Sequence, residues 1–437
     1  MVFTANRTSA FKLLAESYPF QTSNKLLTVY DYESEAVEAM VNTSQNRGAL
    51  TMSAEFSWPR LRINSRKLKE MIVSKNKKKK TKKGLFVFPL HSRITGARYP
   101  YLWMSIAQEN RWHVLVDACA LGPKDMDCFG LSLFRPDFLV CSFYKVFGEN
   151  PSGFGCLLVK KSVISILDTN SCSSNVGIVN LVPADKLFQL AEDSSGTDTE
   201  LEIHHQQFMS QMVPSTSSFS GPISYESMKT AQTSTTQFPE TEEDTNLRSN
   251  VSEIETKCKG LDQMDSLGLI LISTRARCLI NWLVSSLLKL KHPNTEGVSL
   301  VKIYGPKVKF DRGPALAFNV FDWKGEKVEP VLVQKLADRS NISLSYGFLQ
   351  NIWFPEKYAE EKGRVLERKE VGKDEKMKKV KANLGISVVT AALGFLTNFD
   401  DVYKLWCFVA QFLDADFVEK ERWRYTALNQ RTVLEVL

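Results

Sequence analysis

The stretch "SFYKVFGENPSGFG", residues 142–155, places a single lysine, Lys145, between aromatic residues and a series of glycines. The apolar runs on either side of it, "DFLVCSF" and "GFGCLLV", are typical of strands in a sheet that is covered on both faces. Lys145 is therefore expected on the connection between two buried strands. Its amine there either faces solvent or reaches into a cleft, and the neighbouring residues decide between these two positions.

A carboxylate upstream has a comparable position. "HVLVDACALG" predicts a buried strand that ends at Asp117, 28 residues before Lys145. In open α/β sheets, ligands bind beyond the carboxyl ends of the strands. An acid and an amine at such strand ends suit pyridoxal phosphate, because the lysine forms a Schiff base with the aldehyde and the acid keeps the ring nitrogen protonated. The same pattern also fits a strand-end ion pair, or two unrelated solvated charges.

The beginning of the sequence adds a third signal. "VFTA" predicts a short strand, and "NRTSAFKLLAE" predicts a helix that begins after a polar cap. Asn6 and Thr8 would then lie in a turn whose free backbone N–H groups suit a phosphate. Most such turns serve only as caps, so this signal depends on its combination with Asp117 and Lys145.

In this order, the three segments resemble the class V aminotransferase group of fold-type I pyridoxal phosphate enzymes. They look most like the aminotransferase-like domain of molybdenum cofactor sulfurases and of their short plant relatives. "RPDFLVCSFYKVFGENPSGFGCLLVKK" is similar to that family's lysine segment, and "RGPALAFNVFDWKG" resembles a strand of its small domain. The resemblance implies an α/β fold with a mainly parallel sheet in a large domain and a smaller C-terminal α+β domain. The N-terminal part of the family fold is expected to be missing.

The resemblance also implies roles in cofactor binding. Lys145 would be the Schiff-base lysine and Asp117 the partner of the pyridine nitrogen of pyridoxal 5'-phosphate. Thr8 and the amides around Asn6 would hold the phosphate, with a further hydroxyl from Ser142. An active site of this kind would take an amino-acid-like substrate, and the family implies a homodimer.

Departures from the family pattern fall at groups that act on the cofactor ring or on the substrate. Tyr32 stands in place of a ring-stacking histidine, and Arg93 in place of a ring-side asparagine. Gln350 is the counterpart of the small-domain cysteine that takes up sulfur, and Thr390 that of the arginine that anchors a substrate carboxylate. The sequence therefore favours cofactor binding over sulfur transfer.

The composition divides the chain into four predicted segments. These are a large-domain core at 1–164, a low-complexity insert at 165–260, a linking helix at 261–292 and a small domain at 293–437. From about 191 to 257 the chain carries 12 acidic and 3 basic residues and is expected to be largely disordered. This stretch is either a tolerated surface insertion or a phosphorylated or partner-binding segment.

The remaining composition is that of an ordinary soluble protein, with 43% hydrophobic and 24% charged residues among 437. We expect no membrane span, because the sequence has no run of about 18 apolar residues. We expect no metal site, because the eight cysteines form no C-x-x-C pairs. Most of these cysteines lie in apolar segments typical of buried thiols in a reducing compartment, which predicts a cytoplasmic location. The basic run "SKNKKKKTKKG" is read as a solvated loop. Alternatively, Lys77–Lys83 would serve as a nuclear localisation or nucleic-acid patch, but the net charge of +7 is too dispersed to indicate nucleic acid.

Three functions remain open from the sequence. The first is an active pyridoxal phosphate transferase or lyase similar to molybdenum cofactor sulfurase. The second is a catalytically degenerate protein of the same fold that binds partners without sulfur transfer. The third is an interaction protein that uses the acidic insert and the basic run.

Overall fold

The computed structural model describes residues 1–73, 84–119, 134–142, 155–167, 266–293, 298–307, 312–368 and 384–434. Lys145, the Lys77–Lys83 run and the acidic insert lie outside the described residues. The division of the chain into four segments therefore stays a prediction.

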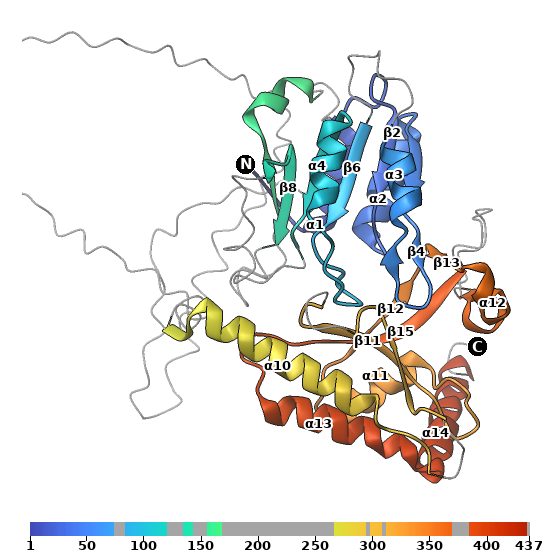
Figure 1. Ribbon diagram of the computed structural model, residues 1–437. Helices are drawn as coiled ribbons and strands as arrows, with labels where there is room; N and C mark the ends of the chain where they lie inside the picture. Colours follow the sequence, from blue (N-terminus) through green and yellow to red (C-terminus); the bar gives the residue numbers. More distant parts are fainter. Residues whose placement is uncertain are drawn as a thin grey trace, which may run out of the picture. The chain divides into compact units, whose positions relative to one another are not determined.

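A seven-stranded sheet forms the first half of the fold (Figure 1). Its order is β1 (Val2–Thr4), β9 (Gly155–Val159), β8 (Phe138–Ser142), β7 (Trp112–Asp117), β6 (Gly84–Pro89), β2 (Lys25–Thr28) and β3 (Leu50–Ser53). The strands from β8 to β3 pair in parallel, and β9 is antiparallel to both of its neighbours. Every residue of β6 and β7 is buried, as the continuous apolar runs predicted. The carboxyl ends of β2, β6, β7 and β8 consequently share one edge of the sheet.

The helix that follows β1 begins at the same edge. Because β1 and β8 are both antiparallel to β9, they run in the same direction. The chain leaves β1 and enters α1 (Arg7–Ser17) through Asn6, whose side chain accepts a hydrogen bond from the Ser9 amide at 2.8 Å. Phe11 and Leu14 bury the apolar face of α1, as their spacing predicted. The other helices of this half are α2 (Glu35–Asn46), α3 (Ser65–Ile72) and α4 (Leu102–Glu109).

An antiparallel sheet forms the second half. Its order is β10 (Val301–Tyr304), β11 (Ala315–Val320), β15 (Leu384–Ala392) and β12 (Ser345–Leu349), with β14 (Glu367–Arg368) also paired to β15. Alternate residues of β11 and β15 belong to different cores. Leu316 and Val389 lie in a cluster with side chains of α10 (Leu269–Leu287), α11 (Pro330–Arg339) and α13 (Phe399–Ala410). Ala317, Ile386 and Val388 lie in the core of the seven-stranded sheet, so both faces of β11 and β15 are covered.

Short elements connect the two halves of the chain. In a three-stranded sheet, β13 (Ile352–Trp353) runs parallel to β4 (Phe56–Ser57), which pairs in turn with β5 (Arg62–Ile63). The Trp58 indole N–H donates to a carboxylate oxygen of Glu361 in α12 (Ala359–Val365) at 2.9 Å. These contacts join residues about 300 positions apart in the sequence.

The C-terminal segment differs from the single closing helix that the sequence predicts over 398–417. Asn398 and Asp401 form a capping box for α13, which ends at Ala410, and a 3₁₀ turn follows over Gln411–Leu413. The Asp414 carboxylate then accepts a hydrogen bond from the Asp416 amide at 3.0 Å, and α14 (Ala415–Leu434) begins there. A polar residue that caps the next helix thus breaks the predicted one.

The cysteines are less uniformly buried than the sequence suggests. Cys119 and Cys156 are buried and Cys141 and Cys407 are half-buried, but Cys278 is exposed on α10. An apolar sequence neighbourhood does not fix which side of a helix faces solvent, so the prediction of a buried thiol is wrong for Cys278.

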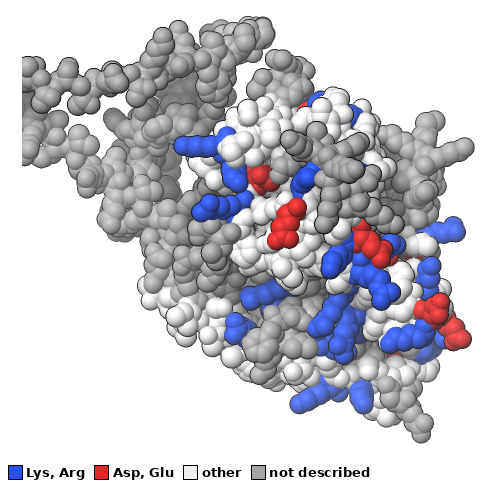
Figure 2. Space-filling view, turned by 45° about the horizontal axis from the view of Figure 1, so that its top comes forward, with Lys and Arg blue, Asp and Glu red and all other residues white. Residues whose placement is uncertain are grey.

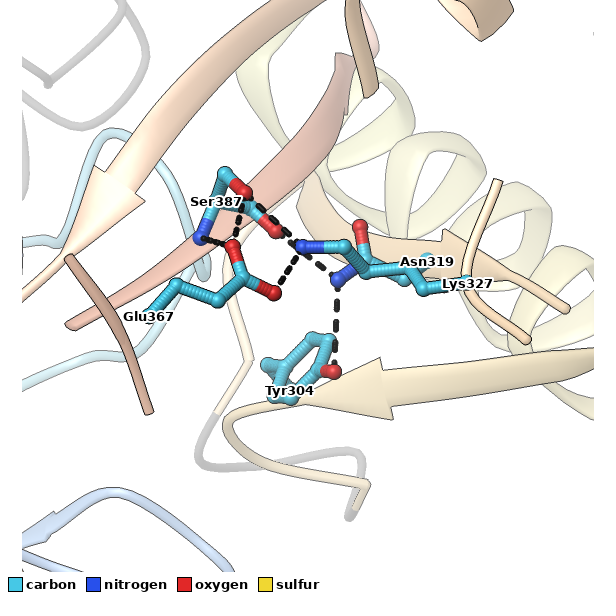
Figure 3. A network of polar contacts seen from close by, with 5 residues as sticks. All are labelled: Tyr304, Asn319, Lys327, Glu367 and Ser387. Carbon is cyan, nitrogen blue, oxygen red and sulfur yellow. Dashed lines mark hydrogen bonds and ion pairs between the residues drawn. The ribbon is translucent and has the colours of Figure 1, made fainter. Parts of the chain in front are cut away.

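A polar network holds the edge strand β14 against the antiparallel sheet (Figure 3). The Lys327 amine forms an ion pair with Glu367 and donates to the Ser387 hydroxyl at 2.8 Å. The Asn319 amide donates to the Ser387 carbonyl at 2.8 Å and to the Tyr304 hydroxyl at 3.3 Å. These contacts connect β14 to β11 and β15, so the network has a structural role.

The described surface carries charges of both signs. On the face in Figure 2, Lys and Arg side chains stand in several groups, with Asp and Glu side chains beside some of them. This pattern is typical of a solvated surface. Among the helices of the described ranges, none is long and apolar enough to cross a membrane.

We predict that Ile386→Val lowers the free energy of unfolding by about 0.5–1.5 kcal/mol, because the lost methylene group comes from a closely packed core. Ile270, which is 85% exposed on α10, provides the matched control. Ile270→Val should change the same quantity by less than about 0.5 kcal/mol. Urea unfolding of both variants measures the difference, and equal effects would show that β15 is not packed on both faces.

Candidate functional site

Asp117 is the centre of the candidate site. It is the last residue of β7, and its side chain is 2% exposed. Its Oδ2 atom accepts hydrogen bonds from Arg7 Nη2 at 2.6 Å and from the Tyr30 hydroxyl at 2.9 Å, and its Oδ1 atom accepts one from the Cys119 amide at 3.1 Å. Three donors from three parts of the chain thus hold one buried carboxylate.

Arg7 reaches Asp117 from the first turn of α1. Its Nη1 atom donates to the Ser34 hydroxyl at 2.9 Å, and its guanidinium lies 4.9 Å from the centre of the Phe11 ring. The side chain is 13% exposed, and its Nε atom has no hydrogen-bond partner among the described residues. Since arginine stays protonated in proteins, a permanent cation is held against Asp117.

The electrostatics favour the charged form of both partners. Burial acts to raise the pKa of Asp117, but the charge and the hydrogen bond of Arg7 outweigh it and hold this pKa below its usual value. Burial likewise acts to lower the pKa of Arg7, but the Asp117 charge leaves it above its usual value. The pair is therefore a buried salt bridge, in which removal of either partner leaves an uncompensated charge.

The predicted phosphate residues lie at the same sheet edge. Asn6 caps α1, and Thr8 is the second residue of this helix and is half-buried. Ser142, at the end of β8, is paired with Gly155 of β9. A Cβ atom on Gly155 would lie 2.9 Å from the Asn6 carbonyl oxygen, so glycine allows the α1 turn to approach these strands. The structure thus brings Asn6 against Gly155, the residue that pairs with Ser142.

The two residues predicted to lie beside the cofactor ring are also near this centre. Tyr32 is 4% exposed, its ring meets the Tyr30 ring edge-on at 5.7 Å, and its hydroxyl has no hydrogen-bond partner within the described part of the chain. Burial raises the pKa of Tyr32, and the charges of Arg7, Asp117 and Arg93 act on the same hydroxyl. The Arg93 side chain is exposed on the loop after β6.

Gln350 and Thr390, the predicted counterparts of the family's cysteine and arginine, both bind the backbone. Gln350 Nε2 donates to the Tyr32 carbonyl at 3.1 Å, and the Gln350 amide donates to the Asp31 carbonyl at 3.0 Å. The Thr390 hydroxyl is buried and donates to the Ile94 carbonyl at 3.3 Å. Both side chains connect the antiparallel sheet to loops of the seven-stranded sheet.

The sequence interpretation missed Arg7 and Tyr30. A cation between Asn6 and Thr8, inside an expected phosphate turn, was a visible signal for Arg7. Tyr30 follows β2 by two residues and had no comparable signal, because only the order of the strands in the sheet brings it to Asp117.

Comparison with known proteins gives a consistent picture. No family model matches the chain. It is 24% identical to the molybdenum cofactor sulfurase of Bos taurus over 376 residues, which cover 80% of this chain and 36% of the bovine protein. It is 30% identical to that of Arabidopsis thaliana over 197 residues, which cover 38% of this chain and 23% of the plant protein. The chain thus matches about a third or less of these relatives.

Two solved structures share the fold. The apo cysteine desulfurase from Thermococcus onnurineus NA1 superposes with a TM-score of 0.54 at 14% identity, over 94% of this chain and 78% of the other. The cystine C-S lyase C-DES in complex with its product cysteine persulfide gives a TM-score of 0.51 at 13% identity, over 94% and 81%. The chain has the class V aminotransferase fold. It is distantly homologous to the aminotransferase region of molybdenum cofactor sulfurases, as the sequence resemblance predicted.

The class V aminotransferase fold implies pyridoxal phosphate, and the described residues fit this cofactor at one end. The N-terminal turn of α1 and the end of β8 offer amides and hydroxyls for a phosphate. At the other end, Arg7 and Tyr30 already hold Asp117, the expected partner of the ring nitrogen. The site therefore fits a phosphate group but does not fit a protonated ring nitrogen.

We predict that Asp117→Asn lowers the free energy of unfolding by about 3–5 kcal/mol at neutral pH, because Arg7 is left buried without a counter-charge. The folded pKa of Asp117 lies below its unfolded value of about 3.9. Its stabilising contribution is therefore present above about pH 3.9 and is lost as the pH falls through the folded pKa.

The difference between wild type and Asp117→Asn should accordingly shrink as the pH falls, which denaturant unfolding between neutral pH and about pH 2 measures. Asp400→Asn, at an exposed position in the first turn of α13, is the control and should lower the free energy of unfolding at neutral pH by no more than about 1 kcal/mol. A pH-independent difference for Asp117→Asn would contradict an ionised, paired Asp117.

Proposed function

We propose that this chain binds pyridoxal phosphate covalently through Lys145 and that it does not transfer sulfur from cysteine. The observation that carries the proposal is the meeting of Asp117, the N-terminus of α1 and the carboxyl end of β8 at one sheet edge. Lys145 follows the last residue of β8 by three positions. In an α/β sheet this edge is where ligands bind.

The chain's own residues would divide the binding between them. The first amides of α1, Thr8 and Ser142 would bind the phosphate, where the positive end of the helix dipole favours an anion. Tyr32 would pack on the ring, with Arg93 at the outer side of the site. When bound, pyridoxal phosphate supplies an aldehyde for the lysine and a ring that withdraws electrons from its substituent.

Among the described residues, the expected position offers no nucleophile for sulfur transfer. The reaction needs a thiolate near the cofactor, and Gln350, at the expected position, binds the Tyr32 carbonyl. Cys119, two residues beyond Asp117, is buried, and burial raises the pKa of its thiol, which disfavours the thiolate. The relatives named as sulfurases and desulfurases therefore indicate the ancestry of this site, and their reaction is not proposed for it.

A substrate anchor is also missing from the expected position. Thr390 offers a hydroxyl that already donates to the Ile94 carbonyl, whereas an arginine would offer a bidentate contact to a carboxylate. This favours the second function considered from the sequence, a protein that retains the fold and the cofactor with little or no turnover. We also propose that the chain forms a homodimer, as the family resemblance implies.

The test is chemical trapping of the cofactor. Purified chain that is mixed with pyridoxal phosphate and reduced with borohydride should carry a pyridoxyl group on Lys145, identified by peptide mass spectrometry, and should absorb in the visible range before reduction. Lys145→Ala should lose both signals, while Lys12→Ala, on the exposed side of α1, should keep them. A folded preparation that stays colourless, with no modified lysine, would refute the proposal.

A further inference from the structure

The hydrogen bonds of Asp117 leave little acceptor capacity for a cofactor. A carboxylate offers about four acceptor positions. Arg7 and Tyr30 occupy two positions on Oδ2, and the Cys119 amide occupies one on Oδ1. A protonated ring nitrogen would be a fourth donor to a group that is already neutralised.

The charge balance leads to the same conclusion. Arg7 and Asp117 together carry no net charge, and both are largely removed from water. Asp117 pairs with the Arg7 guanidinium at 2.6 Å. A pyridinium beside this pair would add a second cation. A cation beside an ionisable nitrogen disfavours protonation of that nitrogen.

Arg7 has one buried hydrogen-bond donor, its Nε–H group, that still lacks an acceptor among the described residues. A guanidinium has donors only, so an uncharged ring nitrogen, which is an acceptor, satisfies this group and a pyridinium N–H does not. The free donor of Arg7 therefore suits a ring nitrogen that carries no proton.

We propose that Arg7 takes the place of the ring proton as the cationic partner of Asp117, so that the site selects a phosphorylated pyridine aldehyde whose ring nitrogen is uncharged. This inference rests on the proposed function and specifies its ligand. Arg7 would act as a specificity-determining residue at the ring nitrogen, while the first amides of α1 would bind the phosphate.

A cofactor ring without the proton on its nitrogen would still bind to this chain but would support less turnover. A protonated ring withdraws electrons more strongly than a neutral one, and an acid beside the nitrogen serves to keep the proton there. With Asp117 committed to Arg7, the ring is held without that proton. The cofactor binds, but its capacity to stabilise negative charge is reduced.

The test compares three probes that differ only at ring position 1. They are pyridoxal phosphate, its analogue with CH in place of the nitrogen, and its N-methyl analogue, which is a fixed cation. Dissociation constants come from absorbance titration of wild type, of Arg7→Ala and of Lys12→Ala as the matched control on the same helix.

Wild type and Lys12→Ala should bind the N-methyl cation at least about tenfold more weakly than pyridoxal phosphate, which corresponds to about one pKa unit of like-charge repulsion. Arg7→Ala should reverse this order, because it leaves Asp117 without its cation. In wild type, the ¹⁵N chemical shift of ring-labelled pyridoxal phosphate should be that of an unprotonated nitrogen, a readout that requires no variant.

Each other outcome has a distinct meaning. If all three probes fail to bind wild type, the proposed function is wrong and this inference falls with it. If pyridoxal phosphate binds wild type but the N-methyl cation binds equally well or better, or if the ¹⁵N shift is that of a protonated nitrogen, the role of Arg7 is wrong while the cofactor site stands.

Discussion

The buried ion pair between Arg7 and Asp117 is the interaction on which the rest of the site depends. It joins the first turn of α1 to the carboxyl end of β7, 110 positions away in the sequence. The Tyr30 hydroxyl adds a third element, from the loop after β2. Because each partner is costly to bury alone, the pair fixes the position of the helix turn and also the charge that a ligand meets there.

The antiparallel sheet is hydrogen-bonded to the residues beside Asp117. Gln350 and Asn351 donate to the carbonyls of Tyr32 and Tyr30, so the loop after β12 is bound to the residues beside Asp117. Thr390 makes a similar contact to the loop that holds Ile94. Gln350 and Thr390 thus serve as structural connections between the two sheets.

The sequence predicted those parts of the structure that depend on local pattern. Continuous apolar runs located β7, β8 and β9, and the polar cap at Asn6 located the start of α1. It also placed Asp117 at a strand end, and the role that it gave this carboxylate toward a cofactor stays a prediction. The contact with Arg7 depends on the parallel order of strands far apart in the chain, which no local pattern contains. The interruption at Asp414 was missed for a different reason, since the apolar stripe continues past a residue that caps a new helix.

The central claim is that Asp117 is ionised and held by Arg7 in the free protein. The most direct measurement is a ¹³C NMR titration of the Asp117 side-chain carboxyl in wild type and in Arg7→Ala. The account predicts a pKa below the ordinary value of about 3.9 in wild type and a rise above it in the variant, where burial acts without the guanidinium. An ordinary or raised pKa in wild type, unchanged by Arg7→Ala, would contradict the account.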